Sequence, residues 1–515
     1  MKFRFSFLFI LLYSIIILFN SCSGKNEKLH IIQINSLKGS IFPTEENGIK
    51  HGGFSLISGV INDISKKQPG PAIILAADNT IHGTPEAYFS QGENVIKVMN
   101  SIGFSAMLIG PREFYYGKET LAKLANLADF PFISANLVKT DGTQIPYIKP
   151  YIVEPDTNTA VIGISSETVL SRNLPEHVKG IKILDPEKTI RTYIQKLGKT
   201  VTSIIVIFPG LKLSSADDRK YAEMLASIPG VDALITGSRQ KQYTGLHYTS
   251  VSEKKTIPRI SVPDGQTDFG KMLTHIIFSS GKKETAVHFL AANENETNPD
   301  PELREIMYIT RKNSNDLLGQ VLGESKTDIS HNHNGESDLG NIICDILRDY
   351  TNTNIVLLNS GSLRNGFSKG DITSRELYSV IPFGGNLVVI EITGKQLLKI
   401  LEHSTVFKNN PDLGRGFLQV SGISFAFNPN QDPGKRLIKS SVNIYGKQLQ
   451  ENKMYTLATD RYIFEGGDGY TEFMEMNIQP KKMYAKTSMQ IILEAIRRKG
   501  TISIPDKGRI KEVAN

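Results

Sequence analysis

Tryptophan is absent from the 515 residues, and cysteine occurs only twice, at Cys22 and Cys344. The absence of tryptophan decides nothing about function, but two cysteines allow at most one disulfide. Lysine and arginine number 59 against 52 acidic residues, yet no run of five or more basic residues occurs. A basic excess spread in this way is no signature of nucleic-acid binding, so no nucleic-acid partner is expected. The sequence also lacks internal repeats and low-complexity tracts, which excludes a solenoid.

The length and the apolar content indicate more than one packed domain. Hydrophobic residues make up 40% of the chain, and charged residues make up 22%. A domain typically has ~100–200 residues, so two substantial domains and a connector are expected.

The first 22 residues have the pattern of a signal peptide. Lys2 and Arg4 form a short basic start, and residues 5–19 are uncharged and strongly apolar. This run is too short for a comfortable membrane span but has the length of a signal-peptide core. The small residues before Cys22 resemble a bacterial lipoprotein cleavage site, and several acyl chains on Cys22 would anchor the chain stably to a membrane. The alternative is an ordinary secreted protein with an incidental cysteine.

The second cysteine has a different setting. Cys344 lies in an apolar-rich helical stretch, residues 339–347. A cysteine of this kind is usually a small buried hydrophobe, so no catalytic thiol is predicted there. If Cys22 is lipidated, no intramolecular disulfide can form.

Two halves follow the signal peptide. Between residues 29 and 289, short β-branched runs alternate with helical segments, which predicts a layered α/β domain. The predicted buried strands are 31–34, 72–76, 160–164, 204–207 and 233–235, and the predicted helices include 119–127 and 217–226. After a polar stretch, Pro301 suits a helix start, and residues 302–315 predict a linking helix. The predicted organisation is therefore a domain at 23–298, a linker helix at 299–319 and a second mixed α/β domain at 320–515.

The second half carries seven short motifs. In chain order they are 336–341 (ESDLGN), 359–364 (NSGSLR), 370–373 (GDIT), 382–386 (PFGGN), 401–404 (LEHS), 417–422 (FLQVSG) and 465–470 (EGGDGY). In this order and at this spacing, residues 318–485 resemble the C-terminal domain of the 5′-nucleotidase family. The resemblance implies a nucleotide-binding domain.

Four residues are candidates for contacts with the base under this resemblance. Phe383 and Tyr462 would stack on its two faces, and each stacking contact is worth ~1–3 kcal/mol. Tyr462 stands where the family usually has phenylalanine, and it keeps the stacking face. Asn359 and Gly361 would meet the base edge. Taken singly, Phe383 and Tyr462 fit core aromatics better and the GGDG segment at 466–469 fits a plain turn better, but together these residues favour a binding site.

The same resemblance assigns the sugar and the phosphate. Asp468, on a glycine-rich turn, would accept hydrogen bonds from ribose hydroxyls. Arg364 would bind phosphate through its planar fork of donors. Ser362 replaces a family glycine where the backbone approaches the ligand, and residues 331–335 lack the arginine that many relatives carry there. A protonated His333 is a candidate for that second phosphate contact, but the sequence favours a solvated loop histidine.

The first half resembles the metallophosphatase domain of the same family, most visibly at residues that are not metal ligands. The matching segments are 83–85 (GTP), 113–114 (EF), 116–117 (YG), 131–136 (PFISAN) and 231–232 (VD). The resemblance implies a layered α/β/β/α sandwich. Such enzymes hold two divalent cations that activate water and clamp the phosphoryl oxygens, through carboxylate, imidazole and amide ligands.

The positions that carry those ligands in the family hold other residues here. The first motif, Asn-Asp-X-His-Gly in the family, is NSLKG at 35–39, and the bridging aspartate is replaced by Asn79. The later motifs read GPRE at 110–113, FPGL at 208–211 and GSRQ at 237–240, and each has lost its histidine. Asp78 could contribute only if its turn shifted by one residue, and none of the seven histidines from His30 to His288 falls at a ligand position. No metal cofactor is therefore expected.

Cations appear at or beside the lost ligand positions, namely Lys38, Arg112 and Arg239. A cationic side chain can partly replace the charge of a metal, and arginine binds phosphate oxygens directly. One hypothesis is an anion pocket that holds phosphate without cleaving it. The equally weighted alternative is a set of solvated charges that fill a collapsed cleft.

Three functions follow from these observations. The leading prediction is a catalytically inactive lipoprotein on the periplasmic or outer face of a bacterial envelope, which binds nucleotides or nucleosides through its C-terminal domain. The alternative is an active 5′-nucleotidase-type phosphohydrolase in nucleotide catabolism with an altered site. The third is an envelope scaffold that keeps the fold for protein contacts only. Fold alone does not separate them.

Overall fold

The computed structural model describes residues 28–77, 79–212, 215–238, 245–252, 255–263, 268–279, 285–382, 384–408, 410, 413 and 415–513. The chain divides into two units, Met1–Thr310 and Arg311–Asn515. The predicted signal peptide with Cys22 lies outside the described residues. Within the described ranges, no helix is both long enough and apolar enough to cross a membrane.

The first unit is built around two β-sheets whose inner faces share one core. One sheet has the strand order β17 (Thr285–Ala291), β16 (Met272–Phe278), β1 (Leu29–Asn35), β4 (Ala72–Ala77), β5 (Ala106–Leu108), β6 (Phe132–Ile133) and β8 (Ile148–Lys149). The other has the order β14 (Gly245–Ser252), β15 (Lys255–Pro263), β13 (Ala233–Ser238), β12 (Ser203–Lys212), β10 (Thr159–Gly163) and β9 (Tyr151–Glu154). Ile31 of β1 and Ile205 of β12 belong to the apolar cluster that the two sheets enclose. All five predicted strands are confirmed.

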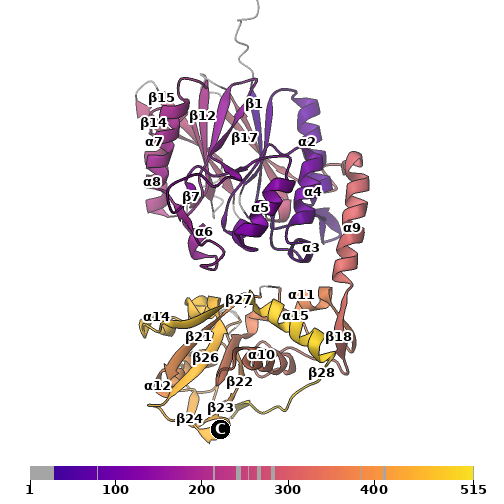
Figure 1. The fold of residues 1–515 in the computed structure, drawn as a ribbon, viewed down its shortest axis with the longest axis vertical. Coiled ribbons are helices and arrows are strands. Elements are labelled where there is room, and N and C mark those ends of the chain that lie inside the picture. Colours follow the sequence, from indigo (N-terminus) through magenta and orange to yellow (C-terminus); the bar gives the residue numbers. More distant parts are fainter. Residues whose placement is uncertain are drawn as a thin grey trace, which may run out of the picture. The chain divides into compact units, whose positions relative to one another are not determined.

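Helices cover the outer faces of both sheets (Figure 1). On one side lie α2 (Phe54–Lys67), α3 (Pro85–Phe89), α4 (Glu93–Ile102) and α5 (Lys118–Leu127), and on the other lie α7 (Pro186–Leu197) and α8 (Ala216–Ala226). In α2, Ile57, Ile61 and Ile64 recur at helical spacing and are buried, as a helix packed on a sheet requires. The predicted α/β/β/α sandwich is therefore confirmed, as are the predicted helices at 119–127 and 217–226.

The linking helix is α9 (Arg304–Leu318), which follows a short 3₁₀ turn at Pro301–Leu303. The side chain of Asp300 accepts a hydrogen bond from the Glu302 amide at the start of this turn. Pro301 lacks an amide hydrogen, so it fits the first position, where no such donor is needed. The proline signal in the sequence thus places the start of the linking segment.

The second unit has a mixed sheet with helices packed against it. Its strand order is β22 (Leu418–Ser421), β19 (Ile355–Asn359), β26 (Met454–Asp460), β21 (Asn386–Thr393) and β27 (Pro480–Thr487). A four-stranded sheet has the order β25 (Lys447–Gln448), β24 (Leu437–Ile444), β23 (Ile423–Phe427) and β29 (Ile510–Glu512). A three-stranded sheet has the order β20 (Gly370–Thr373), β18 (Val321–Ser325) and β28 (Thr501–Ile502). The helices include α10 (Asp338–Thr351), α11 (Ser374–Val380), α12 (Gly394–Thr405), α13 (Arg461–Phe464) and α15 (Ser488–Lys499). Cys344 is a free, fully buried cysteine in α10, as predicted.

Candidate functional site

In the first unit, the loops that follow β1, β4 and β5 meet at one edge of the sheet. These strands are parallel, so their carboxyl ends lie at the same edge, where α/β folds usually place ligands. The amide of Lys38 donates to the Asn79 carbonyl at 2.7 Å, and the amide of Gly39 donates to the Thr80 carbonyl at 2.7 Å. The structure therefore brings together two positions, Lys38 and Asn79, that sequence reasoning assigned to the emptied metal centre.

A buried carboxylate fixes these loops. Glu113 is fully buried, and it accepts hydrogen bonds from the amides of Thr80 at 2.5 Å, Gly110 at 2.9 Å and Asn79 at 3.2 Å. Burial raises the pKa of Glu113 above its ordinary value, and the three amide bonds oppose that effect. Because its oxygens already accept bonds from three loop amides, Glu113 acts as a structural group in this unit.

Two of the predicted cations border the same glycine. A Cβ placed on Gly83 would lie 3.0 Å from the Lys38 Cβ and 3.2 Å from the Arg112 Nη1. Arg112 Nη1 donates to the His82 carbonyl at 3.2 Å and lies 3.1 Å from His82 Nδ1, while Lys38 Nζ lies 5.3 Å from the centroid of the Phe269 ring. Burial, and then the charge of Arg112, lower the pKa of His82 to about 3, so this imidazole is neutral at neutral pH.

These residues do not fit a pair of divalent cations. Among the residues that the structure describes, no group of three or more His, Cys, Asp or Glu side chains is arranged to hold a metal ion. The loop edge instead presents an ammonium and a guanidinium, which repel a metal ion and cannot ligate it while they are charged. Asp78 and Arg239 lie outside the described residues.

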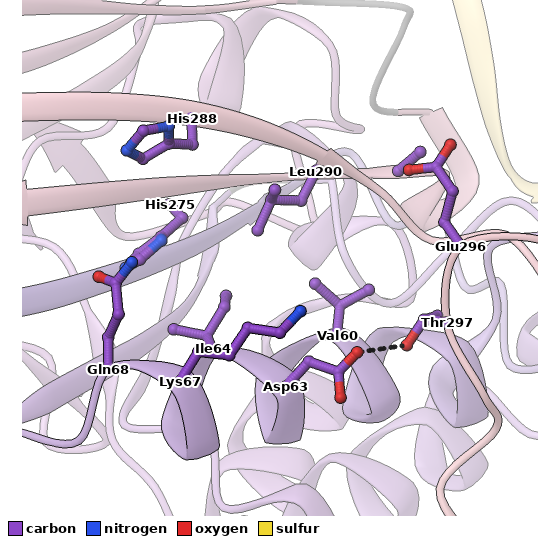
Figure 2. Close-up of a pocket in the computed structure, with 11 residues that line it drawn as sticks. Val60, Asp63, Ile64, Lys67, Gln68, His275, His288, Leu290, Glu296 and Thr297 are labelled. Atoms are coloured by element: carbon purple, nitrogen blue, oxygen red, sulfur yellow. Dashed lines mark hydrogen bonds between the residues drawn. The ribbon is translucent and has the colours of Figure 1, made fainter.

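A cavity of about 320 Å³ lies elsewhere in the first unit, between α2 and strands β16 and β17 (Figure 2). Val60, Ile64 and Leu290 contribute apolar lining, and His275 and His288 approach from the two strands. Burial is the main cause that lowers the pKa of His275 to about 4, so this imidazole is neutral at neutral pH. None of the residues predicted to bind a ligand lines this cavity.

In the second unit, the parallel pairing of β19 and β26 brings two motifs together. The register places Leu357 opposite Thr459, so the NSGSLR segment and the turn that holds Tyr462 and Asp468 begin at one edge of the sheet. Asn359 Nδ2 donates to Asp468 Oδ2 at 2.7 Å. Two predicted contact residues that lie more than a hundred positions apart in sequence are therefore directly hydrogen-bonded.

Tyr462 offers an exposed aromatic face. Its side chain is 54% exposed, and a Cβ added to Gly467 would lie 2.5 Å from its Cε1. The ring therefore rests on a glycine that leaves room for it. Its predicted partner in stacking, Phe383, lies outside the described residues.

A buried acid connects the segment that carries Tyr462 with the loop after Phe383. Asp460 accepts a hydrogen bond from the Tyr462 amide at 2.7 Å and another from the Gly385 amide. Burial raises the pKa of Asp460 to about 6. The carboxylate thus joins the two loops that were predicted to hold the base, a role that sequence reasoning missed.

The NSGSLR loop has a neighbouring cation, Arg415, that sequence reasoning also missed. The carbonyl of Arg415 accepts hydrogen bonds from the Gly361 amide at 2.8 Å and from Ser360 Oγ at 2.9 Å. Partial burial, and then the charge of Arg415, lower the pKa of Arg364, and Asp468 opposes this shift. Arg364 and Arg415 are both exposed, so two guanidinium groups face solvent beside the same loop.

The environment of His333 disfavours its charged form. Burial, followed by the positive charge of Arg415, lowers the pKa of His333 below its ordinary value. Its backbone carbonyl accepts a hydrogen bond from Ser360 Oγ at 2.9 Å. Arg415, which precedes the FLQVSG motif by two residues and gave no signal by itself, is therefore a second cation near the position where the sequence offered His333.

The remaining predicted position, Ser362, has a local partner. Its hydroxyl donates to Asn359 Oδ1. Asn359 is buried, with its amide nitrogen bound to Asp468 and its amide oxygen bound to Ser362. The serine that replaces a family glycine therefore helps to fix the orientation of the Asn359 amide.

Comparison with known proteins agrees with this arrangement. Residues 315–475 match the family model for the 5′-nucleotidase C-terminal domain. The chain is 24% identical over 512 residues to the trifunctional nucleotide phosphoesterase protein YfkN of Bacillus subtilis, an alignment that covers 88% of this chain but 33% of YfkN. It is 23% identical over 540 residues to the protein UshA of Escherichia coli, with 93% of this chain and 94% of UshA covered.

Solved structures show the same fold. A putative 5′-nucleotidase from Staphylococcus aureus superposes with a TM-score of 0.70 at 17% identity, with 95% of this chain and all of that chain covered. A 5′-nucleotidase precursor from Thermus thermophilus gives a TM-score of 0.59 at 22% identity, with 94% and 99% covered. Residues 315–475 thus carry the 5′-nucleotidase C-terminal domain, and the whole chain is similar in sequence and in its two-domain fold to proteins of the 5′-nucleotidase family.

Proposed function

We propose that the chain is an envelope lipoprotein that binds a nucleotide or nucleoside on its second unit and does not hydrolyse it. The observation that carries the proposal is the contrast between the two units. In the second unit, Tyr462, Asp468 and Asn359 form one connected group beside two exposed arginines. In the first unit, Lys38 and Arg112 occupy the loop edge where the family resemblance implies metal ligands.

Each part of a nucleotide has a chemically matching group in the second unit. The exposed ring of Tyr462 suits stacking with a base, which is tolerant of base identity because every base has a π-face. Asp468 suits the hydroxyls of a sugar. Arg364 and Arg415 suit a phosphate, because guanidinium groups bind its oxygens in a planar, charge-assisted geometry. This arrangement argues against a scaffold that keeps only the fold.

The absence of hydrolysis rests on the first unit. A two-metal phosphohydrolase needs cations that activate water and stabilise the charge on the transferred phosphoryl group. Lys38 and Arg112 can stabilise phosphate charge, but neither can generate a hydroxide at neutral pH as a bound metal does. Similar proteins such as the trifunctional nucleotide phosphoesterase protein YfkN make an active enzyme the alternative.

Calorimetry on the protein without residues 1–22 tests the proposal. AMP, adenosine and a dinucleotide would be titrated, and phosphate release would be assayed in parallel with added Mg²⁺, Mn²⁺ or Zn²⁺. Binding without turnover is the expected result. Metal-dependent phosphate release would establish the alternative, and absence of both binding and turnover would favour the scaffold.

The envelope location has a separate test. The apolar run before Cys22 and the small residues that precede it support lipidation at that cysteine. The full chain expressed in a bacterium is expected in the membrane fraction, and a Cys22→Ala variant is expected to lose acylation. Labelling with a radioactive fatty acid that is unaffected by Cys22→Ala would contradict this part of the proposal.

A further inference from the structure

The hydroxyl of Tyr462 is a group that the family resemblance does not explain, because phenylalanine would supply the same stacking face. In the structure this hydroxyl is fully engaged with one residue. It donates to Asp468 Oδ1 at 2.8 Å, and it accepts from the Asp468 amide at 3.2 Å. The two bonds close a ring between a phenol and the backbone and side chain of a single aspartate.

Asp468 needs such support. Its backbone lies in the left-handed region with φ of 51°, which costs a residue other than glycine of order 1 kcal/mol, although aspartate tolerates it better than most. Asn359 Nδ2 holds its other oxygen, Oδ2, at 2.7 Å, and His403 Nε2 lies 3.4 Å from its carbonyl oxygen. Tyr462 and Asn359 therefore fix both oxygens of the carboxylate from opposite sides.

These hydrogen bonds leave part of the acceptor capacity of the Asp468 carboxylate for a ligand. An ionised carboxylate has about four lone-pair sites, two on each oxygen. Tyr462 uses one site on Oδ1, and Asn359 uses one site on Oδ2. One site remains on each oxygen, and two such sites match the two hydroxyl donors of a cis-diol.

We propose that the Tyr462 hydroxyl is a positioning group that aims the Asp468 carboxylate at the 2′- and 3′-hydroxyls of a ribose. The proposal rests on the proposed function, since it requires that the second unit binds a nucleoside or nucleotide. It adds that the site selects ribose over deoxyribose and that the phenol, and not only its ring, carries part of this selection. A fixed carboxylate lowers the ordering cost of binding, which is the general advantage of a preorganised site.

The phenol stays a donor over the working pH range. Burial, and then the hydrogen bond to Asp468, raise the pKa of Tyr462 above its ordinary value. The charged groups around Asp468 are Arg364 and the pair formed by His403 and Glu472, in which His403 Nδ1 lies 3.1 Å from Glu472 Oε1. Arg364 and His403 interact with the charge of Asp468, and the hydrogen bond from the phenol remains in place beside them.

The Tyr462→Phe variant removes the hydroxyl and keeps the aromatic ring, so it tests the role of the hydroxyl alone. Binding of adenosine, 2′-deoxyadenosine and 2′,3′-dideoxyadenosine to this variant and to the unaltered protein would be measured by calorimetry. The expected result is a loss of up to roughly tenfold in affinity for adenosine, because binding must then order the Asp468 side chain that the phenol no longer holds in place. A smaller loss is expected for 2′-deoxyadenosine, and none is expected for the dideoxy compound, which has no hydroxyl for Asp468.

Two controls make the result specific. Tyr445→Phe removes a phenol hydroxyl from another exposed tyrosine of the same unit, which is 58% exposed and lies 3.4 Å from the Thr353 carbonyl, and it should leave all three affinities unchanged. In an Asp468→Ala background, Tyr462→Phe should have no further effect on adenosine.

The outcomes are distinguishable from a failure of the proposed function. If the unaltered protein binds none of the three compounds and no AMP, both proposals fall. If it binds them and Tyr462→Phe weakens all three equally, the hydroxyl acts through the fold and the positioning role is refuted. Unchanged or tighter binding of adenosine by Tyr462→Phe would refute it as well.

Discussion

Replacing Arg415 with alanine removes one of the two guanidinium groups beside the NSGSLR loop while leaving the base and sugar contacts in place. Hydrogen bonds that involve a charged partner contribute about 1.5–3 kcal/mol when they form in a protein. Both Arg364 and Arg415 are exposed, so solvent screening places each contact at the lower end, about 1.5 kcal/mol. That free energy corresponds to a loss of about tenfold in affinity for AMP.

The assay is calorimetry with AMP and adenosine on four proteins: unaltered, Arg415→Ala, Arg364→Ala and the double variant. Each single variant should weaken AMP about tenfold and leave adenosine unchanged, because adenosine has no phosphate. The effect should shrink at high salt, since both charges are exposed to screening ions. Arg498→Ala, which removes an exposed charge from the last turn of α15, is the matched control and should change neither affinity.

Two results would refute this reasoning. Equal losses for AMP and adenosine would show that the Arg415 side chain supports the conformation of the loop and does not act through phosphate, since the alanine variant keeps the carbonyl that binds Gly361 and Ser360. Unchanged AMP affinity in Arg415→Ala, with a loss only in Arg364→Ala, would show that a single arginine carries the phosphate contact.

Three further predictions address other parts of the chain. Burial raises the pKa of Asp460 from 3.8 to about 6, so its protonated form stabilises the fold fully below pH 3.8, and this contribution is lost as pH rises through 6. Relative to Asp460→Asn, the free energy of unfolding of the unaltered protein should fall by about 2–2.5 kcal/mol between pH 4 and pH 7, and parallel pH profiles of denaturant unfolding would contradict this. The buried side-chain amide of Gln33 has no hydrogen-bond partner within the described residues, so Gln33→Leu should raise the free energy of unfolding by about 1–2 kcal/mol; a lower thermal midpoint would show that the amide is satisfied in solution. If the loop edge of the first unit is an anion pocket, Lys38→Ala with Arg112→Ala should weaken AMP binding in calorimetry, and unchanged affinity would support the alternative of solvated charges.

The sequence by itself determined many elements of the fold and the resemblance to the family. Buried parallel strands are continuous apolar runs, so β1, β4, β10, β12 and β13 were readable from composition alone. Residues 302–315 were readable as a helix because Pro301 marks its start. Seven short motifs identified the resemblance to the family. One such motif would be a weak signal, but seven in the family's order and spacing are specific.

Tertiary structure alone decided which residues act together. The parallel pairing of β19 with β26 joins Asn359 to Asp468, and the antiparallel pairing of β19 with β22 brings Arg415 to the NSGSLR loop. Such pairings are long-range, and no local pattern in the sequence encodes which strands become neighbours. Burial, and then the charge of Arg415, lower the pKa of His333, because both disfavour the charged imidazole, and the sequence alone shows neither effect.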